Sequence, residues 1–361
     1  MTERSVLQRK EPSQQALLGR LSALDRLLPI WILLAMAAGL ALGRLFPALQ
    51  ASLDAVKVGQ TSLPIALGLL LMMYPVLAKV HYGELSHVGR DRKLMRLSLW
   101  LNWVLGPLLM FTLAWVFLPD LPGYRTGLIV IGLARCIAMV LIWNDLACGN
   151  REVATLLVAI NSIFQILAYA LLGTFYLQIL PSWLGLESQD VVFSTWEISK
   201  AVLIFLGIPL VAGALTRWLG VRFKGERWYD TRLLPKLSPW ALYGLLFTIV
   251  VMFALQGQAM TSNPVQVARV ALPLLLYFLI MWTLALVWSR RAGLDYARST
   301  AVAFTAAGNN FELAIAVSIG VWGVTSQQAL AGVVGPLIEV PVLVVLVYVS
   351  LWLKPRLWRQ P

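Results

Sequence analysis

The sequence predicts an all-α integral membrane protein with ten transmembrane helices, and three observations support this class. Of the 361 residues, 59% are hydrophobic, only 13% are charged, and the apolar residues gather into ten long runs. Soluble domains usually carry about 25% charged residues. A helix needs about 20 apolar residues to cross a bilayer, and each run approaches or exceeds this length. A single bundle of ten spans therefore accounts for most of the chain.

The first half of the chain contains five of these runs. The residues before them, 1–26, are predicted to form a polar cytoplasmic tail. Trp31 and Trp100 lie near the ends of runs, as expected for side chains that anchor helices at the membrane surface. The runs are Leu27–Leu45, Thr61–Ala78, Leu97–Leu118, Thr126–Ala147 and Val153–Leu180.

The second half of the chain contains the other five runs. Trp196, Trp240 and Trp352 again lie near their ends, which fits the same interfacial role. The runs are Ala201–Leu219, Trp240–Met260, Val270–Ser289, Ser299–Val321 and Ala329–Leu353.

The ten runs divide into two sets of five. These are residues 27–180 and 201–353, joined by a predicted external loop at 181–200 and followed by a cytoplasmic tail at 354–361. A unit with an odd number of spans takes the opposite orientation when it is repeated. The two sets are therefore predicted to form inverted five-helix repeats, an arrangement typical of secondary transporters. This prediction rests on hydropathy alone, because the halves share no convincing residue-by-residue identity.

Lysine and arginine residues are distributed unevenly between the predicted loops. With loops assigned alternately to the two sides, 23 of the 29 fall on the side of both termini and five on the other, while Arg135 lies within a run. Positive charge marks cytoplasmic loops, so both termini are predicted to be cytoplasmic in a bacterial plasma (inner) membrane. The net charge of +12 and the pI near 10 thus reflect topology in a lipid bilayer, and no nucleic-acid partner is expected.

Polar residues interrupt the fourth run of each half. Arg135 and Cys136 lie near the middle of one, and Gly308-Asn309-Asn310-Phe311-Glu312 breaks the other. A charge at bilayer depth is costly and normally faces a partner or a water-filled cavity. Irregular backbone is tolerated at that depth only where protein surrounds it. The fourth and ninth spans are therefore predicted to be discontinuous and to form a transport site.

Cys136 has two interpretations. A lone cysteine is most often a small buried hydrophobe. Arg135 stays charged in proteins, so a thiol beside it is expected to form a thiolate, a soft ligand that suits a thiophilic substrate such as a trivalent metalloid. Cys136 and Arg135 are therefore candidate substrate-binding residues. Cys148, at the predicted cytoplasmic end of the same span, is expected to serve packing.

Four further polar residues are candidates for the site. Glu312 and Glu339 are expected deep in the membrane, where a carboxyl group can carry a proton; the alternative is an ion pair with Arg135. Asn309 and Asn310 can bind substrate or cap an unwound helix, and the sequence does not separate these roles. Phosphate-binding loops, metal-site spacings and nucleophile elbows are absent from the sequence, so no cofactor is expected.

Several polar segments carry a resemblance to a known family. They are Gly132–Val140 continuing to Trp143-Asn144-Asp145, Asn161–Gln165, Ala307–Ala314 and Gly335–Pro341. Together they strongly resemble the arsenical-resistance arsenite permeases, which belong to the superfamily that also contains bile acid/sodium symporters. The similarity extends from about Leu24 to Leu353.

The resemblance implies a fold and a function. The implied fold has ten helices in a core domain and a panel domain, with the interrupted fourth and ninth spans crossing. The implied function is secondary active efflux of arsenite, and often antimonite, driven by protons that move inward, without a soluble ATPase partner. The family's essential cysteine corresponds to Cys136 and its ninth-span glutamate to Glu312, while Glu339 matches a second acidic position. Cys148 departs from the more usual polar residue at its place.

Other functions remain open at this point. A sodium-coupled organic anion symporter would show sodium-dependent uptake and no need for Cys136. A passive metalloid channel would be insensitive to proton uncouplers. A membrane-embedded enzyme is the weakest alternative, because one thiol and two carboxyl groups alone are expected at depth. The choice between Glu312 and Glu339 as the main proton carrier also stays open.

Overall fold

The computed structural model describes residues 27–46, 57–58, 61–80, 91–186 and 194–358, and the structural statements below concern these residues. The predicted N-terminal tail lies outside this part of the chain. Among the described residues, seven continuous helical stretches are long and apolar enough to cross a membrane, and some of them consist of two helices joined by a π-helical turn. Two shorter apolar helices, Leu63–Ala78 and Phe311–Trp322, accompany them. The chain is therefore an all-α membrane protein, as its composition predicts.

In the first half, every predicted apolar run contains helix. A two-residue antiparallel hairpin, β1 (Lys57–Val58) and β2 (Thr61–Ser62), precedes the second helix. The helices are α3 (Leu28–Leu45), α5 (Leu63–Ala78), α7 (Arg92–Trp100), α8 (Gly106–Phe117), α9 (Pro122–Leu133), α10 (Met139–Leu146), α11 (Arg151–Thr174) and α12 (Leu180–Trp183). Single π-helical turns, η3 (Leu101–Leu105) and η4 (Phe175–Ile179), join α7 to α8 and α11 to α12.

The second half has the same character. Its helices are α13 (Thr195–Val202), α14 (Ile208–Lys224), α15 (Glu226–Trp228), α16 (Leu234–Ser262), α17 (Pro264–Arg291), α18 (Tyr296–Ala307), α19 (Phe311–Trp322) and α20 (Gln327–Leu357). The π-helical turns η5 (Leu203–Gly207) and η6 (Tyr229–Leu233) join α13 to α14 and α15 to α16. Helices α12 and α13 extend into both ends of the predicted 181–200 loop, and α20 continues four residues past 353.

Polar side chains begin several of these helices. Asp91 accepts a hydrogen bond from the N–H of Leu94 (3.1 Å), and Asn150 accepts one from the N–H of Val153 (2.9 Å). Such caps pair N–H groups that the first helical turn leaves without a partner. They mark the starts of α7 and α11, where basic or polar turns meet the apolar runs.

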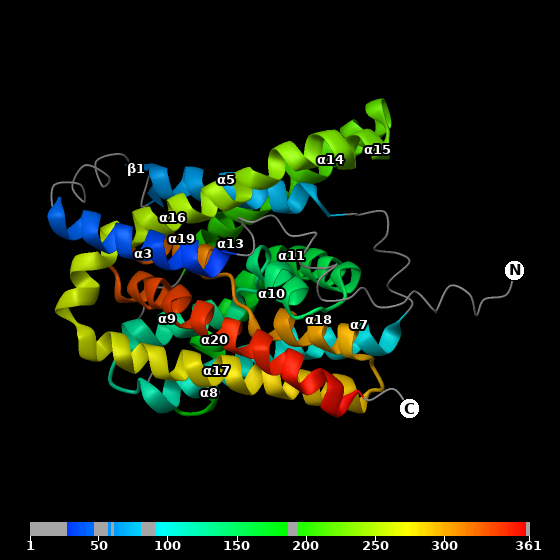
Figure 1. Ribbon diagram of the computed structural model, residues 1–361. Helices are drawn as coiled ribbons and strands as arrows, with labels where there is room; N and C mark the ends of the chain where they lie inside the picture. Colours follow the sequence, from blue (N-terminus) through cyan, green and yellow to red (C-terminus); the bar gives the residue numbers. More distant parts are fainter. Residues whose placement is uncertain (1–26, 47–56, 59–60, 81–90, 187–193, 359–361) are drawn as a thin grey trace, which may run out of the picture.

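The helices pack in two groups. Helix α16 packs along α3 and α5, and α14 packs against α5; these four form the smaller helix group. The larger helix group contains α8 to α11 and α17 to α20, with α17 packed against α8, α18 and α20. Figure 1 shows α5, α14 and α16 together along one side and α8, α17 and α20 along the other. The site described below lies where the two groups meet.

Close helix contacts within the smaller group depend on small residues. A Cβ atom at Gly244 of α16 would lie 2.7 Å from the backbone nitrogen of Met72 in α5. Small residues at interfaces of this kind let membrane helices approach each other closely. This packing fixes the position of α5, which contributes Met73 to the wall of the site.

Candidate substrate site

Two helix interruptions lie at the positions that the sequence indicated. Helix α9 ends at Leu133 and α10 begins at Met139, while α18 ends at Ala307 and α19 begins at Phe311. The two interruptions pair with each other through their backbones, because Arg135 and Asn309 form an isolated antiparallel β-bridge.

Backbone hydrogen bonds join the two interruptions at the place where they meet, which is called the crossing below. The N–H of Cys136 donates to the carbonyl oxygen of Gly308 (3.2 Å), and the N–H of Asn310 donates to the carbonyl oxygen of Ala134 (3.1 Å). Buried backbone groups outside a helix need such partners, above all at membrane depth. Each interruption therefore supplies the hydrogen-bond partners that the other has lost.

Side chains from neighbouring helices attach to this crossing. The amide oxygen of Gln165 in α11 accepts the N–H of Arg135 at 2.5 Å. The side-chain Nδ2 of Asn309 donates to the carbonyl oxygen of Ile131 (3.0 Å), and the backbone N–H of Asn309 donates to Oε1 of Glu339 in α20 (3.3 Å). These bonds join α9, α11 and α20 to one point in the larger helix group.

Arg135 is completely buried, and its guanidinium bonds to uncharged oxygen atoms. Its guanidinium donates to the hydroxyl of Tyr277 (2.8 Å) and to the carbonyl oxygens of Ala306 (3.4 Å) and Gly132. Gly106 makes room for it, since a Cβ there would lie 2.8 Å from Nη1 of Arg135. The guanidinium thus lies between α8 and α17.

This placement bears on two interpretations of Arg135 from the sequence, the alternative of an ion pair and the effect of its charge on Cys136. Among the described residues, Arg135 has no ion pair with Glu312 or Glu339; its hydrogen bonds go to uncharged oxygens. No hydrogen bond joins the guanidinium of Arg135 to the thiol of Cys136 either, so its charge has no direct contact with that thiol. The physical reason is the local backbone: in an extended segment, consecutive side chains point to opposite sides. The side chain of Arg135 therefore bonds to α9, α17 and α18, while the side chain of Cys136 points to the opposite side of this segment.

Cys136 is buried and faces a small cavity of about 10 Å³. Such a volume holds about one water molecule. The residues that line the cavity are Met73, Cys136, Ile137, Ala138, Met139, Asn310 and Glu312. The thiol, one carboxyl group and one carboxamide thus share a cavity at the crossing.

Glu339 lies close to Gly308, as does the side chain of Cys136. A Cβ atom at Gly308 would lie 3.0 Å from Cβ of Cys136 and 3.6 Å from Oε1 of Glu339. Glu339 is completely buried, and its Oε1 already accepts the Asn309 N–H. The structure therefore brings all six predicted site residues to the crossing, with Glu312 lining the cavity and Glu339 bonded to the backbone N–H of Asn309.

Several polar atoms at the crossing are buried without a hydrogen-bond partner. They are Nε2 of Gln165, Oδ1 of Asn309, Nδ2 of Asn310 and Oε2 of Glu339. Buried polar atoms are nearly always paired, so a group of donors and acceptors that lack partners indicates a place for a polar ligand. The site can offer hydrogen bonds to a hydroxylated molecule next to a soft sulfur ligand.

Three residues that contact this site were not candidates in the sequence analysis. Gln165 was visible as a polar residue inside an apolar run, but its contact with Arg135 depends on the fold. Tyr277 and Met73 lie in apolar runs where nothing distinguishes them from packing residues.

Cys148 lies in the turn after α10, buried and away from the cavity, with a left-handed φ of 56°. Such a conformation is several-fold enriched in asparagine and aspartate, which gives a reason for a polar residue there.

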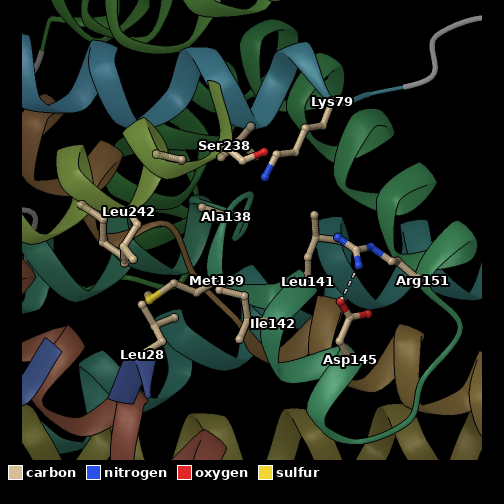
Figure 2. Close-up of a pocket in the computed structure, with 13 residues that line it drawn as sticks. Leu28, Lys79, Ala138, Met139, Leu141, Ile142, Asp145, Arg151, Ser238 and Leu242 are labelled. Carbon is tan, nitrogen blue, oxygen red and sulfur yellow. Dashed lines mark ion pairs between the residues drawn. The ribbon is translucent and has the colours of Figure 1, made fainter. Parts of the chain in front are cut away.

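A second cavity of about 100 Å³ lies between the two helix groups. Its walls come from α3, α5 and α16 on one side and from α10 and α11 on the other. Figure 2 shows Lys79 and Ser238 across the cavity from the ion pair between Asp145 and Arg151, whose atoms are 3.2 Å apart. Ala138 and Met139 line both this cavity and the smaller one. The large cavity therefore leads to the wall of the thiol site.

Comparisons with known proteins agree with this architecture. Residues 66–263 match the Sodium Bile acid symporter family. The chain is 58% identical over 339 residues to the "Arsenical-resistance protein Acr3" of Corynebacterium glutamicum, covering 94% of this chain and 92% of that protein. It is 31% identical over 336 residues to the protein of the same name from Alkaliphilus metalliredigens, covering 90% and 92%. An uncharacterized transporter of Synechocystis sp. is 34% identical over 348 residues, covering 91% and 88%. The chain therefore belongs to the arsenite permease family of arsenical-resistance proteins, within the sodium bile acid symporter family, whose members are multi-pass membrane transporters and not enzymes.

Proposed function

We propose that this protein exports arsenite, and also antimonite, across the bacterial plasma membrane in exchange for protons that move inward. The observation that carries the proposal is the shared cavity of Cys136 and Glu312 at the crossing of two interrupted helices. The names of two similar proteins, both arsenical-resistance proteins, support the choice of substrate.

The thiol of Cys136 supplies reversible binding. Arsenous acid carries three hydroxyl groups, and a thiol condenses with one of them to form an S–As bond and release one water molecule. Water reverses this reaction at the other side of the membrane, which restores the thiol and frees arsenous acid. A single sulfur ligand holds arsenic weakly enough for release, whereas three would trap it. Asn309 and Asn310 supply the acceptor and donor atoms that can bind the remaining hydroxyls.

A carboxyl group supplies the coupling. Arsenous acid is uncharged at neutral pH, so the membrane potential cannot expel it unless another ion moves as well. Glu312 lines the thiol cavity, whereas Glu339 is bonded to the backbone of Asn309. This contrast favours Glu312 as the group that takes up a proton outside and releases it inside.

The ten helical segments would form two inverted five-helix repeats, with the smaller helix group as the panel domain and the larger as the core domain. In such transporters one domain moves against the other and exposes a midplane site to each side in turn. The thiol cavity holds about one water molecule, so substrate binding requires it to widen. The larger cavity lies beside Arg151, which the charge distribution assigns to the cytoplasm. It would be the path by which arsenite reaches the site from inside.

The test is arsenite uptake into everted membrane vesicles that contain this protein and no soluble ATPase partner. An acid-inside pH gradient should drive arsenite accumulation, and a proton uncoupler should abolish it. Flux that the uncoupler leaves unchanged would indicate a passive channel. Transport that requires sodium would indicate a sodium-coupled symporter instead.

A further inference from the structure

The thiol cavity has walls from both helix groups. Cys136, Asn310 and Glu312 come from the larger group, and Met73 comes from α5 of the smaller group. Met73 is 2% exposed, so its side chain lies inside the protein and not in the lipid. A thioether from one group and a thiol from the other therefore line the same cavity.

We propose that the Met73 thioether is a second soft contact for the metalloid bound to Cys136, and that it favours antimonite over arsenite. This inference rests on the function proposed above. Thioether sulfur is a soft, polarizable donor that suits soft acceptors. Trivalent antimony is larger and softer than trivalent arsenic, so it gains more from a weak additional sulfur contact. The contact leaves the S–metalloid bond to Cys136 as the one bond that forms and breaks.

A second observation indicates that a polar ligand belongs beside Met73. Asn310 is 2% exposed, lines the same cavity, and its Nδ2 has no hydrogen-bond partner. Its Oδ1 is already used, because it caps α19 through the N–H of Leu313 (3.0 Å). A metalloid on Cys136 would thus have a hydrogen-bond donor for one hydroxyl and a soft sulfur for its apolar side. Of the remaining wall residues, Ile137 and Ala138 offer neither, while Met139 offers a thioether from the same helix group as Cys136 and is therefore tested beside Met73.

The adjacent residue provides a matched control. Met72 lies in the same helix and is 1% exposed, but it does not line the thiol cavity. A methionine-to-leucine change conserves volume and usually costs little stability at either position. An effect that Met73→Leu shows and Met72→Leu lacks therefore comes from the sulfur in the cavity.

The experiment measures binding of arsenite and of antimonite to the purified full-length protein by titration calorimetry. Met73→Leu should raise the Kd for antimonite about fivefold and the Kd for arsenite less than about twofold, a difference that corresponds to the small energy of a thioether contact. Met72→Leu should leave both values unchanged. Equal Kd values for wild type and Met73→Leu, or an equal rise for both ligands, would make Met73 a packing residue.

A spectroscopic readout needs no change in affinity. In selenomethionine-labelled protein, X-ray absorption at the antimony edge should detect a selenium neighbour that disappears in Met73→Leu and persists in Met72→Leu and in Met139→Leu, the other methionine of the cavity wall. Absence of selenium in the labelled wild type would overturn the Met73 contact. Failure of the proposed function looks different: antimonite and arsenite would then bind Cys136→Ser as tightly as the wild type.

Discussion

The backbone N–H of Asn309 donates to Oε1 of Glu339 at 3.3 Å, and this bond distinguishes the surroundings of Glu339 from those of Glu312. Glu339 supports the interrupted backbone of the ninth span. Glu312 lines the cavity that contains the thiol. The change from glutamate to glutamine is therefore expected to have different effects at the two positions.

Glu312→Gln should lose arsenite accumulation driven by a pH gradient but keep binding or slow equilibration. The amide retains the shape and hydrogen-bonding capacity while it removes the exchangeable proton. Glu339→Gln should keep gradient-driven transport, because the glutamine oxygen can still accept the Asn309 N–H. Uptake into everted vesicles measures both variants. The opposite pattern, with loss in Glu339→Gln alone, would place the proton on the tenth span.

Cys136→Ser should abolish arsenite resistance in growing cells while the amount of protein in the membrane stays normal. Serine is slightly smaller and hydroxylic, so it conserves most of the volume but removes the soft ligand. Immunoblots of membranes and growth in arsenite measure the two quantities. Cys148→Ser is the control and should retain resistance, since Cys148 lies outside the cavity. Resistance in Cys136→Ser would show that its thiol serves packing.

Tyr277→Phe should destabilise the protein by about 1–3 kcal/mol, because it removes the acceptor of a buried, charged donor on Arg135. Thermal unfolding in detergent measures the effect. Tyr243→Phe is the control for loss of a hydroxyl at an exposed position, since Tyr243 is 50% exposed whereas Tyr277 is buried. Gly106→Ala should be harmful for the same reason, as its methyl group would displace the guanidinium. Equal melting temperatures for all variants would argue against a supporting role for Arg135.

Asp120→Asn should lower thermal stability by the same small amount from about pH 5.5 to about pH 8. Asp120 lies between α8 and α9 and forms a two-point ion pair with Arg269 at the start of α17, with one N–O distance of 2.7 Å. The bond to Arg269 lowers the pKa of Asp120 from 3.8 to about 2. A lowered folded-state pKa gives stability that is present above 3.8 and is lost as the pH falls toward 2. A wild-type advantage that shrinks between pH 8 and pH 5.5 would contradict the pairing.

A reporter fused after Pro361 should give a cytoplasmic signal, and one inserted between Leu186 and Ser194 an external signal. The uneven distribution of lysine and arginine supplies the reason. Alkaline phosphatase and a fluorescent protein, which are active on opposite sides, measure the two positions independently. A cytoplasmic signal from the insertion would contradict the ten-span arrangement.

The sequence predicts the crossing well and its side-chain directions poorly. Arg135 and the Gly308–Glu312 segment break apolar runs, so the energetic cost of polar groups at depth was enough to locate both interruptions. The direction of Arg135 depends on an extended backbone that forms only when the two interruptions pair. The role of Met73 could not be predicted, because a methionine in an apolar helix fits every pattern of a packing residue. Gln165 is intermediate, since its polarity is visible but its partner is not.

Ala138 and Met139 line both cavities, so one layer of side chains separates the thiol from the larger space. Ala138 has only a methyl group, and Met139 has an unbranched side chain with three rotatable bonds. Side-chain rotations take place in picoseconds to nanoseconds, while movements of whole domains take microseconds to milliseconds. Under the proposed function, the passage between the larger space and the thiol would open far faster than the two helix groups move, so this layer of side chains would not limit the turnover number.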